Sequence, residues 1–484
     1  MFSFLISVAA LVVGYLLYGR FVDKVFGPNP NLVTPAVSKA DNVDFIAMPP
    51  WKVYMIQFLN IAGTGPIFGA IMGAKFGPSA YLWIVFGCIF AGAVHDYLSG
   101  MLSVRHGGAG YPVLVGRYLG ETTKKVMLIF SIILLLMVGA VFVYSPAVIL
   151  GGMVGDGSQG SMMLWVFVIF AYYVIATLLP IDKIIGRIYP VFAVALLFMA
   201  VALMVCLLIK WPTLPEFWNG LQNRGPSLGL EGQPIFPCLF ITIACGAVSG
   251  FHATQSPLMA RCITTEKLGR PIFYGAMVTE GLVALIWAAV ASYFFFDGGA
   301  AEVGSDLSAS APVVVTKVSQ SWLGVLGGIL AVLGVVAAPI TSGDTAFRSA
   351  RLIIADFLHL DQKPMRKRLY IAVPLFVLSG LLLWYNIADA NGFNVIWRYF
   401  GWSNQTLSVF MFWTATVYLV RNKPGLYYLI ALIPGLFMTS VCTTFILVDK
   451  IGLGLPQTLI PWIALGTFAI SAILFYLWKY RKNR

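Results

Sequence analysis

Two carboxylates, Asp96 and Glu280, lie deep within long apolar segments of the chain. A charged group inside a membrane is costly, so such residues generally belong to a proton relay, an ion pathway or a pair between helices. His95 directly precedes Asp96 and could share its proton, although a lone buried histidine is more often a hydrogen-bonded core residue. We predict that His95, Asp96 and Glu280 carry an ion or a proton, with helix pairing as the structural alternative.

Two other apolar segments are interrupted by glycine near their centres. They read NIAGTGPIFG at residues 60–69 and ACGAVSGFH at residues 244–252. Glycine leaves the helical conformation easily, and proline removes a backbone donor and clashes with the preceding turn. Unpaired backbone at membrane depth persists only where it is buried in protein or lines a cavity. We therefore predict an unwound stretch in each segment, with Pro66 in the first turn of a new half-helix.

An unwound helix exposes amide donors at the positive end of a half-helix, where an anionic group such as a carboxylate binds. The carbonyls freed by the same break suit a cation. His252 follows the second break and is expected to contact substrate or to bridge helices. The predicted substrate-binding residues are Asn60, Gly63, Thr64, Gly65, Ser249, Gly250 and His252. The spacing of Gly69, Gly73 and Gly77 instead favours close helix packing.

A third polar group, in the sequence APITSGDTAF, contains the oxygen-bearing residues Thr341, Ser342, Asp344 and Thr345. Oxygen ligands suit a hard cation, so Thr341, Ser342 and Asp344 are added to the predicted ion- or proton-coupling residues. The alternative is an ordinary helix end and restart.

No catalytic residue, resident metal or cofactor is predicted. The four histidines are scattered, the six cysteines lack zinc spacing, and GPSLG at 225–229 matches GxSxG without the preceding strand that motif requires. Co-transported H⁺ or Na⁺ is the expected ion.

The elements that position these groups are membrane helices. Of 484 residues, 59% are hydrophobic and only 10% are charged, against about 25% charged in soluble proteins. A soluble enzyme, a disordered chain and a disulfide scaffold are excluded. Thirteen apolar stretches are long enough to span a bilayer. They are 2–19, 53–74, 79–103, 125–149, 162–180, 188–209, 235–257, 272–296, 322–343, 369–385, 403–420, 425–448 and 458–478.

The basic residues predict the orientation. Of the 31 lysines and arginines, 25 lie at or beyond the ends of odd-numbered stretches and 6 lie at the other side. Because basic residues stay in the cytoplasm, the N-terminus is expected outside and the C-terminal tail, with Arg484, inside. The most basic segment includes 345–358, which resembles an amphipathic helix in contact with lipid headgroups.

The breaks divide the chain into repeats. Each opens a set of five helices, and five is odd, so the second set runs with opposite orientation, as in transporters with inverted repeats. We expect an extra N-terminal helix and cytoplasmic loop at 1–52, a first repeat at 53–210 and an external loop at 211–234. A second repeat at 235–420 and two helices with a basic tail at 421–484 follow.

Several motifs resemble the carbon starvation protein A family. They are IAGTGPIFGAI at 61–71, the segment 76–108 that contains GAVHDYLSG, ACGAVSGFH at 244–252 and GDTAFRSARLIIADFL at 343–358. The resemblance covers about residues 50 to 360. It implies a secondary transporter of the bacterial cytoplasmic membrane, linked to uptake of peptides or of pyruvate with protons, within the amino acid–polyamine–organocation superfamily and its LeuT-like fold.

The expected protein is therefore all-α and polytopic, with a LeuT-like five-plus-five inverted repeat. It is expected to import short peptides, amino acids or pyruvate-like acids with H⁺ or Na⁺. Its partners are a small-molecule substrate and the lipid bilayer, not nucleic acid, and the oligomeric state stays open. A passive channel and, less favoured, a membrane-embedded enzyme are the alternatives.

Overall fold

The computed structural model describes residues 1–153, 158–178, 185–362, 364–389 and 392–482. Every regular element within these ranges is helical. Parts of the predicted loop between 162–180 and 188–209, and Arg484 of the predicted basic tail, lie outside the described residues.

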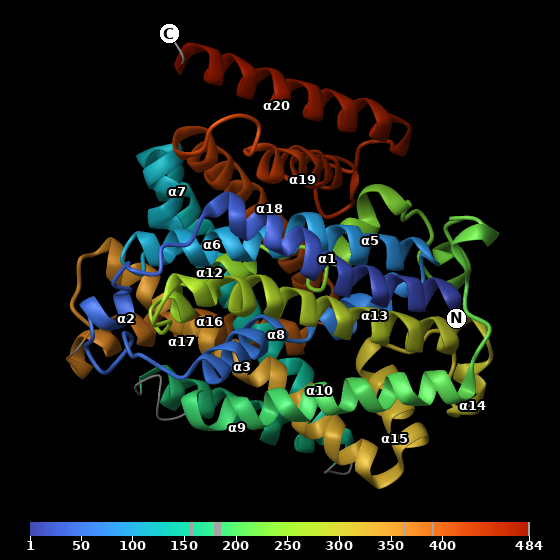
Figure 1. The fold of residues 1–484 in the computed structure, drawn as a ribbon. Coiled ribbons are helices and arrows are strands. Elements are labelled where there is room, and N and C mark those ends of the chain that lie inside the picture. Colours follow the sequence, from blue (N-terminus) through green and yellow to red (C-terminus); the bar gives the residue numbers. More distant parts are fainter. Residues whose placement is uncertain (154–157, 179–184, 363, 390–391, 483–484) are drawn as a thin grey trace.

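The long helices lie side by side and run across the view in Figure 1, with α20 along one edge of the bundle. The first half contains α1 (Phe2–Phe26), α3 (Pro50–Ile61), α4 (Ala70–Ala74), α5 (Ser79–Gly87), α6 (Ala93–Arg105), α7 (Tyr111–Leu119), α8 (Glu121–Met153), α9 (Gln159–Leu178) and α10 (Ile185–Lys210). The second half contains α11 (Phe240–Thr242), α12 (Phe251–Ala260), α13 (Gly275–Phe296), α15 (Ala311–Leu330), α16 (Ala337–Phe357), α17 (Met365–Ala388), α18 (Gly392–Asn422), α19 (Leu429–Val448) and α20 (Ile460–Lys482).

Length and composition identify fewer spans than the thirteen expected. Ten helical segments among the described residues qualify, and eleven if the bent pair Pro50–Ile61 and Gly65–Ala74 is one span. Two predicted stretches do not qualify as spans by length and composition. They are 235–257, where only short helices flank a break, and 403–420, which lies in α18. Four polar residues of α18, Ser403, Asn404, Gln405 and Ser408, are buried inside the protein and lower its hydropathy.

The connecting segments gather at two opposite ends of the bundle. At one end the Met48 amide donates to Cys262 O at 3.2 Å, and Arg105 pairs with Glu266. At the other end the Thr213 amide donates to Asp297 at 2.8 Å. The first set joins segments after odd-numbered predicted spans, and the second joins segments after even-numbered ones. These contacts agree with the alternation used to predict the topology.

The expected lipid-facing helix at 345–358 is wrong. These residues continue α16, which begins at Ala337, and the side chains of Arg348 and Arg351 are 1% and 0% exposed. Both guanidinium groups pair with Asp44. An amphipathic pattern marks a helix with one charged face, and here that face meets protein rather than lipid.

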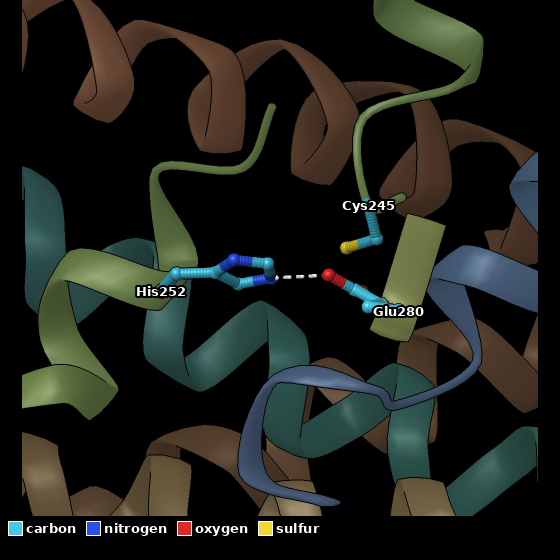
Figure 2. A group of neighbouring side chains, drawn as sticks. All are labelled: Cys245, His252 and Glu280. Atoms are coloured by element: carbon cyan, nitrogen blue, oxygen red, sulfur yellow. Dashed lines mark ion pairs between the residues drawn. The ribbon is translucent and has the colours of Figure 1, made fainter. Parts of the chain in front are cut away.

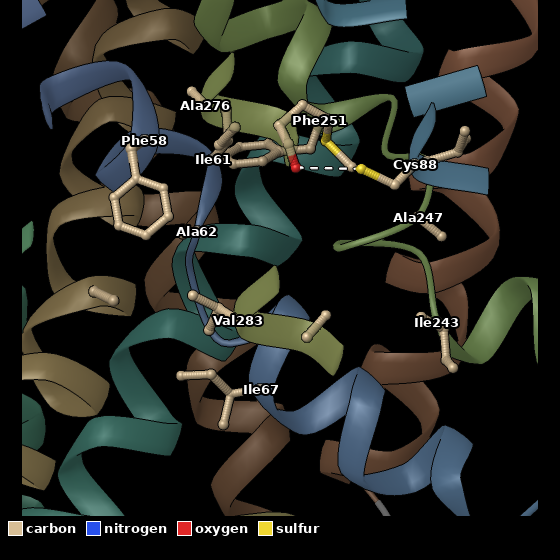
Figure 3. Close-up of a cluster of buried hydrophobic side chains, with 14 of the residues drawn as sticks. Phe58, Ile61, Ala62, Ile67, Cys88, Ile243, Ala247, Phe251, Ala276 and Val283 are labelled. Carbon is tan, nitrogen blue, oxygen red and sulfur yellow. Dashed lines mark hydrogen bonds between the residues drawn. The ribbon is translucent and has the colours of Figure 1, made fainter. Parts of the chain in front are cut away.

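Close packing around the breaks follows from small residues. A Cβ on Gly73 would lie 2.2 Å from the Ile243 side chain, so the packing interpretation of Gly69 and Gly73 is confirmed. Gly77 serves a turn instead, with φ of +88°. Figure 3 shows the core formed there by apolar side chains of the two interrupted segments and α13, including Ile67, Ile243 and Val283.

Candidate functional site

The first break separates α3 from a short π-helical turn at Gly65–Gly69 that continues into α4. Residues 62–64 are not helical, and the two parts are bent by 54°. Pro66 lies in the first turn of the second part, as predicted. The bend leaves residues 61–65 fully buried in the middle of the protein.

The second break is longer. Residues 243–250 are not helical, and α12 starts again at Phe251. Gly246 has φ of +89°, a conformation that side chains with a Cβ rarely adopt. A Cβ on it would also lie 2.4 Å from Ala284 Cβ of α13. The structure therefore requires glycine at position 246, both because of its backbone conformation and because a side chain would not fit.

The two breaks touch each other. A Cβ built on Gly65 would lie 2.3 Å from the sulfur of Cys245, so the absence of a side chain allows the first unwound stretch to pack against the second. The two predicted binding stretches are thus in contact and lie at a single site in the structure.

A chain of four buried ionisable groups crosses this place. The Asp96 carboxylate lies between two imidazoles, with Oδ1 2.8 Å from His95 Nδ1 and Oδ2 2.8 Å from His252 Nδ1. The other ring nitrogen of His252, Nε2, lies 3.5 Å from Glu280 Oε2. All four side chains are fully buried. His252 therefore joins the carboxylates of α6 and α13. No local pattern in the sequence indicated this link.

Cys245 lies beside this chain. Figure 2 shows its sulfur close to the His252–Glu280 pair, and the candidate ligand atoms of the three residues lie within 4.8 Å of one another. A thiolate, an imidazole and a carboxylate are all ligands that transition metals accept, so these three side chains could hold such a metal. In this structure the imidazole faces a carboxylate at each nitrogen, and the Cys245 thiol lies 3.5 Å from Ser249 Oγ. The described contacts of His252 are thus ion pairs with the carboxylates on both sides of its ring.

Several polar atoms near the first break have no hydrogen-bond partner among the described residues. They include both amide atoms of Asn60 and the hydroxyl of Thr64, and both side chains are fully buried. Buried polar atoms are normally paired, because an unmet hydrogen bond costs about 1–3 kcal/mol. Asn60 and Thr64 are therefore suited to bind a polar ligand between the breaks.

Asn404 of α18 was not predicted. Its side-chain oxygen accepts hydrogen bonds from the Phe251 amide at 2.6 Å and from Ser249 Oγ at 3.1 Å. Its carbonyl accepts from the Gly250 amide. The donors at the start of α12, expected to face a substrate anion, are thus occupied in this conformation. The available signal was the polar run SNQT within an otherwise apolar stretch.

The helix end and restart considered for 341–345 is wrong, and a cation site there stays a prediction. This segment lies inside α16, neither ending nor restarting a helix. Thr341 donates to its own helix at Ala338 O, Ser342 donates to Leu59 O at 3.0 Å, and Asp344 accepts from Tyr189 at 2.8 Å. Threonine and serine hydroxyls can donate to the carbonyls of the preceding helical turn. The polar run is therefore compatible with a continuous helix. Ser342 lies beside the first break, since a Cβ on Gly63 would lie 3.3 Å from its hydroxyl oxygen.

A cleft of about 630 Å³ opens between α8, α9 and α15, with Tyr144 and Thr316 among its lining residues. Phe142, half a turn before Tyr144, packs against Phe251 at the second break, and a Cβ on Gly63 would lie 2.8 Å from its ring. Phe142 thus contacts both breaks, and Tyr144 of the same helix lines the cleft.

Comparison with known proteins matches nearly the whole chain. The model of the family described as carbon starvation protein CstA matches residues 1–148, 146–321 and 307–445. An uncharacterized membrane protein of Haemophilus influenzae is 47% identical over 61% of this chain and 91% of its own length.

Two relatives have named activities. The peptide transporter CstA of Escherichia coli is 25% identical over 90% of this chain and 79% of its own length. The pyruvate/proton symporter BtsT of the same bacterium is 25% identical over 93% of this chain and 81% of its own length. Among solved structures, a manganese transporter of Eremococcus coleocola shares the fold, with a TM-score of 0.55 and 12% identity over 91% of this chain and 98% of its own.

Proposed function

Because this chain belongs to the carbon starvation protein CstA family, we propose that it is a secondary active transporter that imports small carboxylate-bearing nutrients with protons. The observation that carries the proposal is the contact of two unwound helices beside the buried chain His95–Asp96–His252–Glu280. Discontinuous helices that meet in this way mark substrate and ion sites in transporters.

Substrate would bind between the breaks. Asn60 and Thr64 offer unpartnered polar atoms there, and the amides near Gly63 and Gly65 lie at the start of a half-helix, where a carboxylate is favoured. The named activities of two relatives, peptide transport and pyruvate/proton symport, support a cargo with a carboxylate. Short peptides, amino acids and pyruvate-like acids all carry one.

The proton would use the ion-paired chain. Asp96 and Glu280 lie on different helices and share His252, so a proton gained or lost by one group changes the charge that its neighbour faces. A change of pairing would alter how α12 sits against α6 and α13. This provides a link between protonation and the geometry of the second break.

The architecture supports alternating access around this place. We propose that residues 53–210 and 235–420 are two five-helix repeats of LeuT-like type, that thirteen segments cross the bacterial cytoplasmic membrane, and that the C-terminus is inside. The two repeats would run in opposite orientations. The first two helices of each repeat would then rock together against the remaining helices.

Uptake by purified protein in proteoliposomes tests the proposal. With an inward proton gradient, labelled pyruvate or a labelled dipeptide should accumulate above its external concentration, and an equal sodium gradient should not drive this. Equilibration without accumulation would support a passive channel instead. Appearance of a hydrolysed or otherwise altered product would support an enzyme.

A further inference from the structure

Three side chains beside the second break, Cys245, His252 and Glu280, are of the kinds that bind zinc. A thiolate, an imidazole nitrogen and a carboxylate oxygen are the ligand types found in zinc sites. Their ligand atoms all lie within 4.8 Å of one another, and Figure 2 shows the sulfur next to the carboxylate that faces the ring. Within the described residues, no second group of three such side chains comes this close.

The separation of His252 and Glu280 fits two ligands of one ion better than it fits a direct hydrogen bond. Nε2 lies 3.5 Å from Oε2, whereas charge-assisted hydrogen bonds of this kind are usually about 2.7–2.9 Å long. Zinc–ligand bonds of about 2.0–2.3 Å in a tetrahedron keep neighbouring ligand atoms about 3.3–3.6 Å apart. To complete such a set, the Cys245 sulfur would have to approach by about 1.2 Å at most.

The atoms on both sides of this gap lack ordinary hydrogen bonds. His252 Nε2 and both carboxylate oxygens of Glu280 have no hydrogen-bond partner among the described residues, although both side chains are fully buried. Their neighbours at longer range are the Cys245 thiol and the Gly246 backbone. Leaving a buried polar atom unpaired is costly, and the cost is larger for a charged group. A divalent cation would satisfy these atoms together and balance the charges of a thiolate and a carboxylate.

Asp96 holds His252 in the orientation that a metal-binding histidine needs. A histidine that binds a metal through one ring nitrogen almost always has its other nitrogen bonded to a carboxylate, a carbonyl or water, which fixes the ring. His252 Nδ1 lies 2.8 Å from Asp96 Oδ2, so Nε2 is the nitrogen directed at Glu280. The other oxygen of Asp96 lies 2.8 Å from His95 Nδ1. The carboxylate behind the imidazole is therefore itself held in place.

An ion at this position would connect the elements on both sides of the second break. Cys245 belongs to the unwound residues 243–250, His252 lies in the first turn of α12, and Glu280 lies in α13. Bonds from one ion to all three would fix the break in the conformation described here. The ion would also occupy the space between His252 and Glu280 that belongs to the proposed proton chain.

We propose that Cys245, His252 and Glu280 bind one Zn²⁺, with water as the fourth ligand, and that the bound ion inhibits uptake by fixing the second break. The thiol proton is released when the sulfur binds the ion, and Nε2 binds as an unprotonated nitrogen. The thiolate favours Zn²⁺ and Co²⁺ over Mn²⁺ and Mg²⁺, which suit oxygen ligands. Binding of the ion does not rest on the proposed function, whereas inhibition of uptake does.

Binding of Co²⁺ to the purified protein in detergent tests the site. The wild-type protein should show a near-ultraviolet thiolate-to-cobalt charge-transfer band, which Zn²⁺ should abolish and Mn²⁺ at equal concentration should not. Cys245→Ser should lose the band. Cys442→Ser is the matched control, because it alters another buried cysteine, in α19, and should keep the band. Absence of the band from the wild-type protein, or its persistence in Cys245→Ser, would overturn the site.

Thermal unfolding gives a second measurement with a different variant. Zn²⁺ should raise the unfolding temperature of the wild-type protein by several degrees, and chelation by EDTA should reverse the gain. Glu280→Gln keeps the shape of the side chain but removes the anionic ligand, so its gain with Zn²⁺ should be much smaller. An equal gain in Glu280→Gln would remove Glu280 from the site.

Uptake into proteoliposomes tests inhibition. Micromolar Zn²⁺ should stop proton-driven accumulation of labelled pyruvate or dipeptide by the wild-type protein and by Cys442→Ser, and EDTA should restore it. Cys245→Ser, compared with its own uptake in the absence of Zn²⁺, should be far less sensitive. A cobalt band without inhibition by Zn²⁺ would overturn the fixing of the break. A cobalt band in a protein that accumulates neither cargo would reject the proposed function and leave the metal site standing.

Discussion

Asp96 Oδ2 lies 2.8 Å from His252 Nδ1, which connects a carboxylate of α6 to the first turn of α12. The two residues are 156 positions apart in sequence and belong to different predicted repeats. A change in the charge on Asp96 would therefore alter a contact that holds the start of α12.

Replacing Asp96 by asparagine should separate proton coupling from substrate binding. Asn keeps the shape of the side chain and removes the charge that lies between the two imidazoles. Proton-driven uptake should fall at least tenfold, whereas exchange of labelled for unlabelled pyruvate without a gradient should persist. Glu280→Gln should behave alike. If both variants keep the wild-type dependence of uptake on pH, coupling does not pass through these carboxylates.

A side chain at position 65 should block transport. Gly65→Leu should abolish uptake without preventing membrane insertion, because even its Cβ would lie 2.3 Å from Cys245 Sγ. Gly466→Leu is the control, since nothing lies within 4 Å of a Cβ there. If Gly65→Ala loses uptake through the same contact, combining it with Cys245→Gly should restore uptake, because the second change removes the contacting side chain. Full uptake by Gly65→Leu would show that the breaks need not touch.

Asn404→Ala should destabilise the protein. The variant leaves the Phe251 amide and the Ser249 hydroxyl without their acceptor, at a cost of about 1–3 kcal/mol for buried groups. Thermal unfolding in detergent measures the loss. Asn422→Ala, near the end of the same helix, removes only a bond to Tyr418 O and should have a smaller effect. Equal stability of the two variants would mean that Asn404 does not hold the second break.

Asn60→Ala should weaken substrate binding more than it affects folding. The amide of Asn60 has no protein partner among the described residues, so its removal breaks no hydrogen bond within the fold. We expect KM for uptake to increase about tenfold, which corresponds to about 1.4 kcal/mol. Ser342→Ala is the comparison, because it removes a bond to Leu59 O and should lower the unfolding temperature instead. An unchanged KM would place the substrate elsewhere.

The sequence predicted the features that have local causes. The breaks follow from Gly63–Pro66 and Gly246–Gly250, and the buried carboxylates stand out because their surroundings are apolar. The role of His252 as the link between them could not be predicted, since it depends on the packing of three helices distant in sequence.

Other failures arise where one pattern has two physical causes. A charged face on 345–358 occurs both at a lipid surface and against a buried carboxylate such as Asp44, and only the fold distinguishes them. The polar residues around Asn404 lower the hydropathy of α18, and Asn404 itself accepts hydrogen bonds from the amides of Gly250 and Phe251 at the second break. Apolarity alone therefore does not identify α18 as a candidate span.

The packing of Gly65 on Cys245 also places a single thiol where the two halves of the molecule meet. In this conformation Cys245 is 4% exposed, so thiol reagents in water are shielded from it. Any state in which the breaks separate would open a path to that sulfur. The rate at which Cys245 is alkylated, in a chain whose other cysteines have been replaced, would then follow the opening of the transporter with and without substrate or a proton gradient.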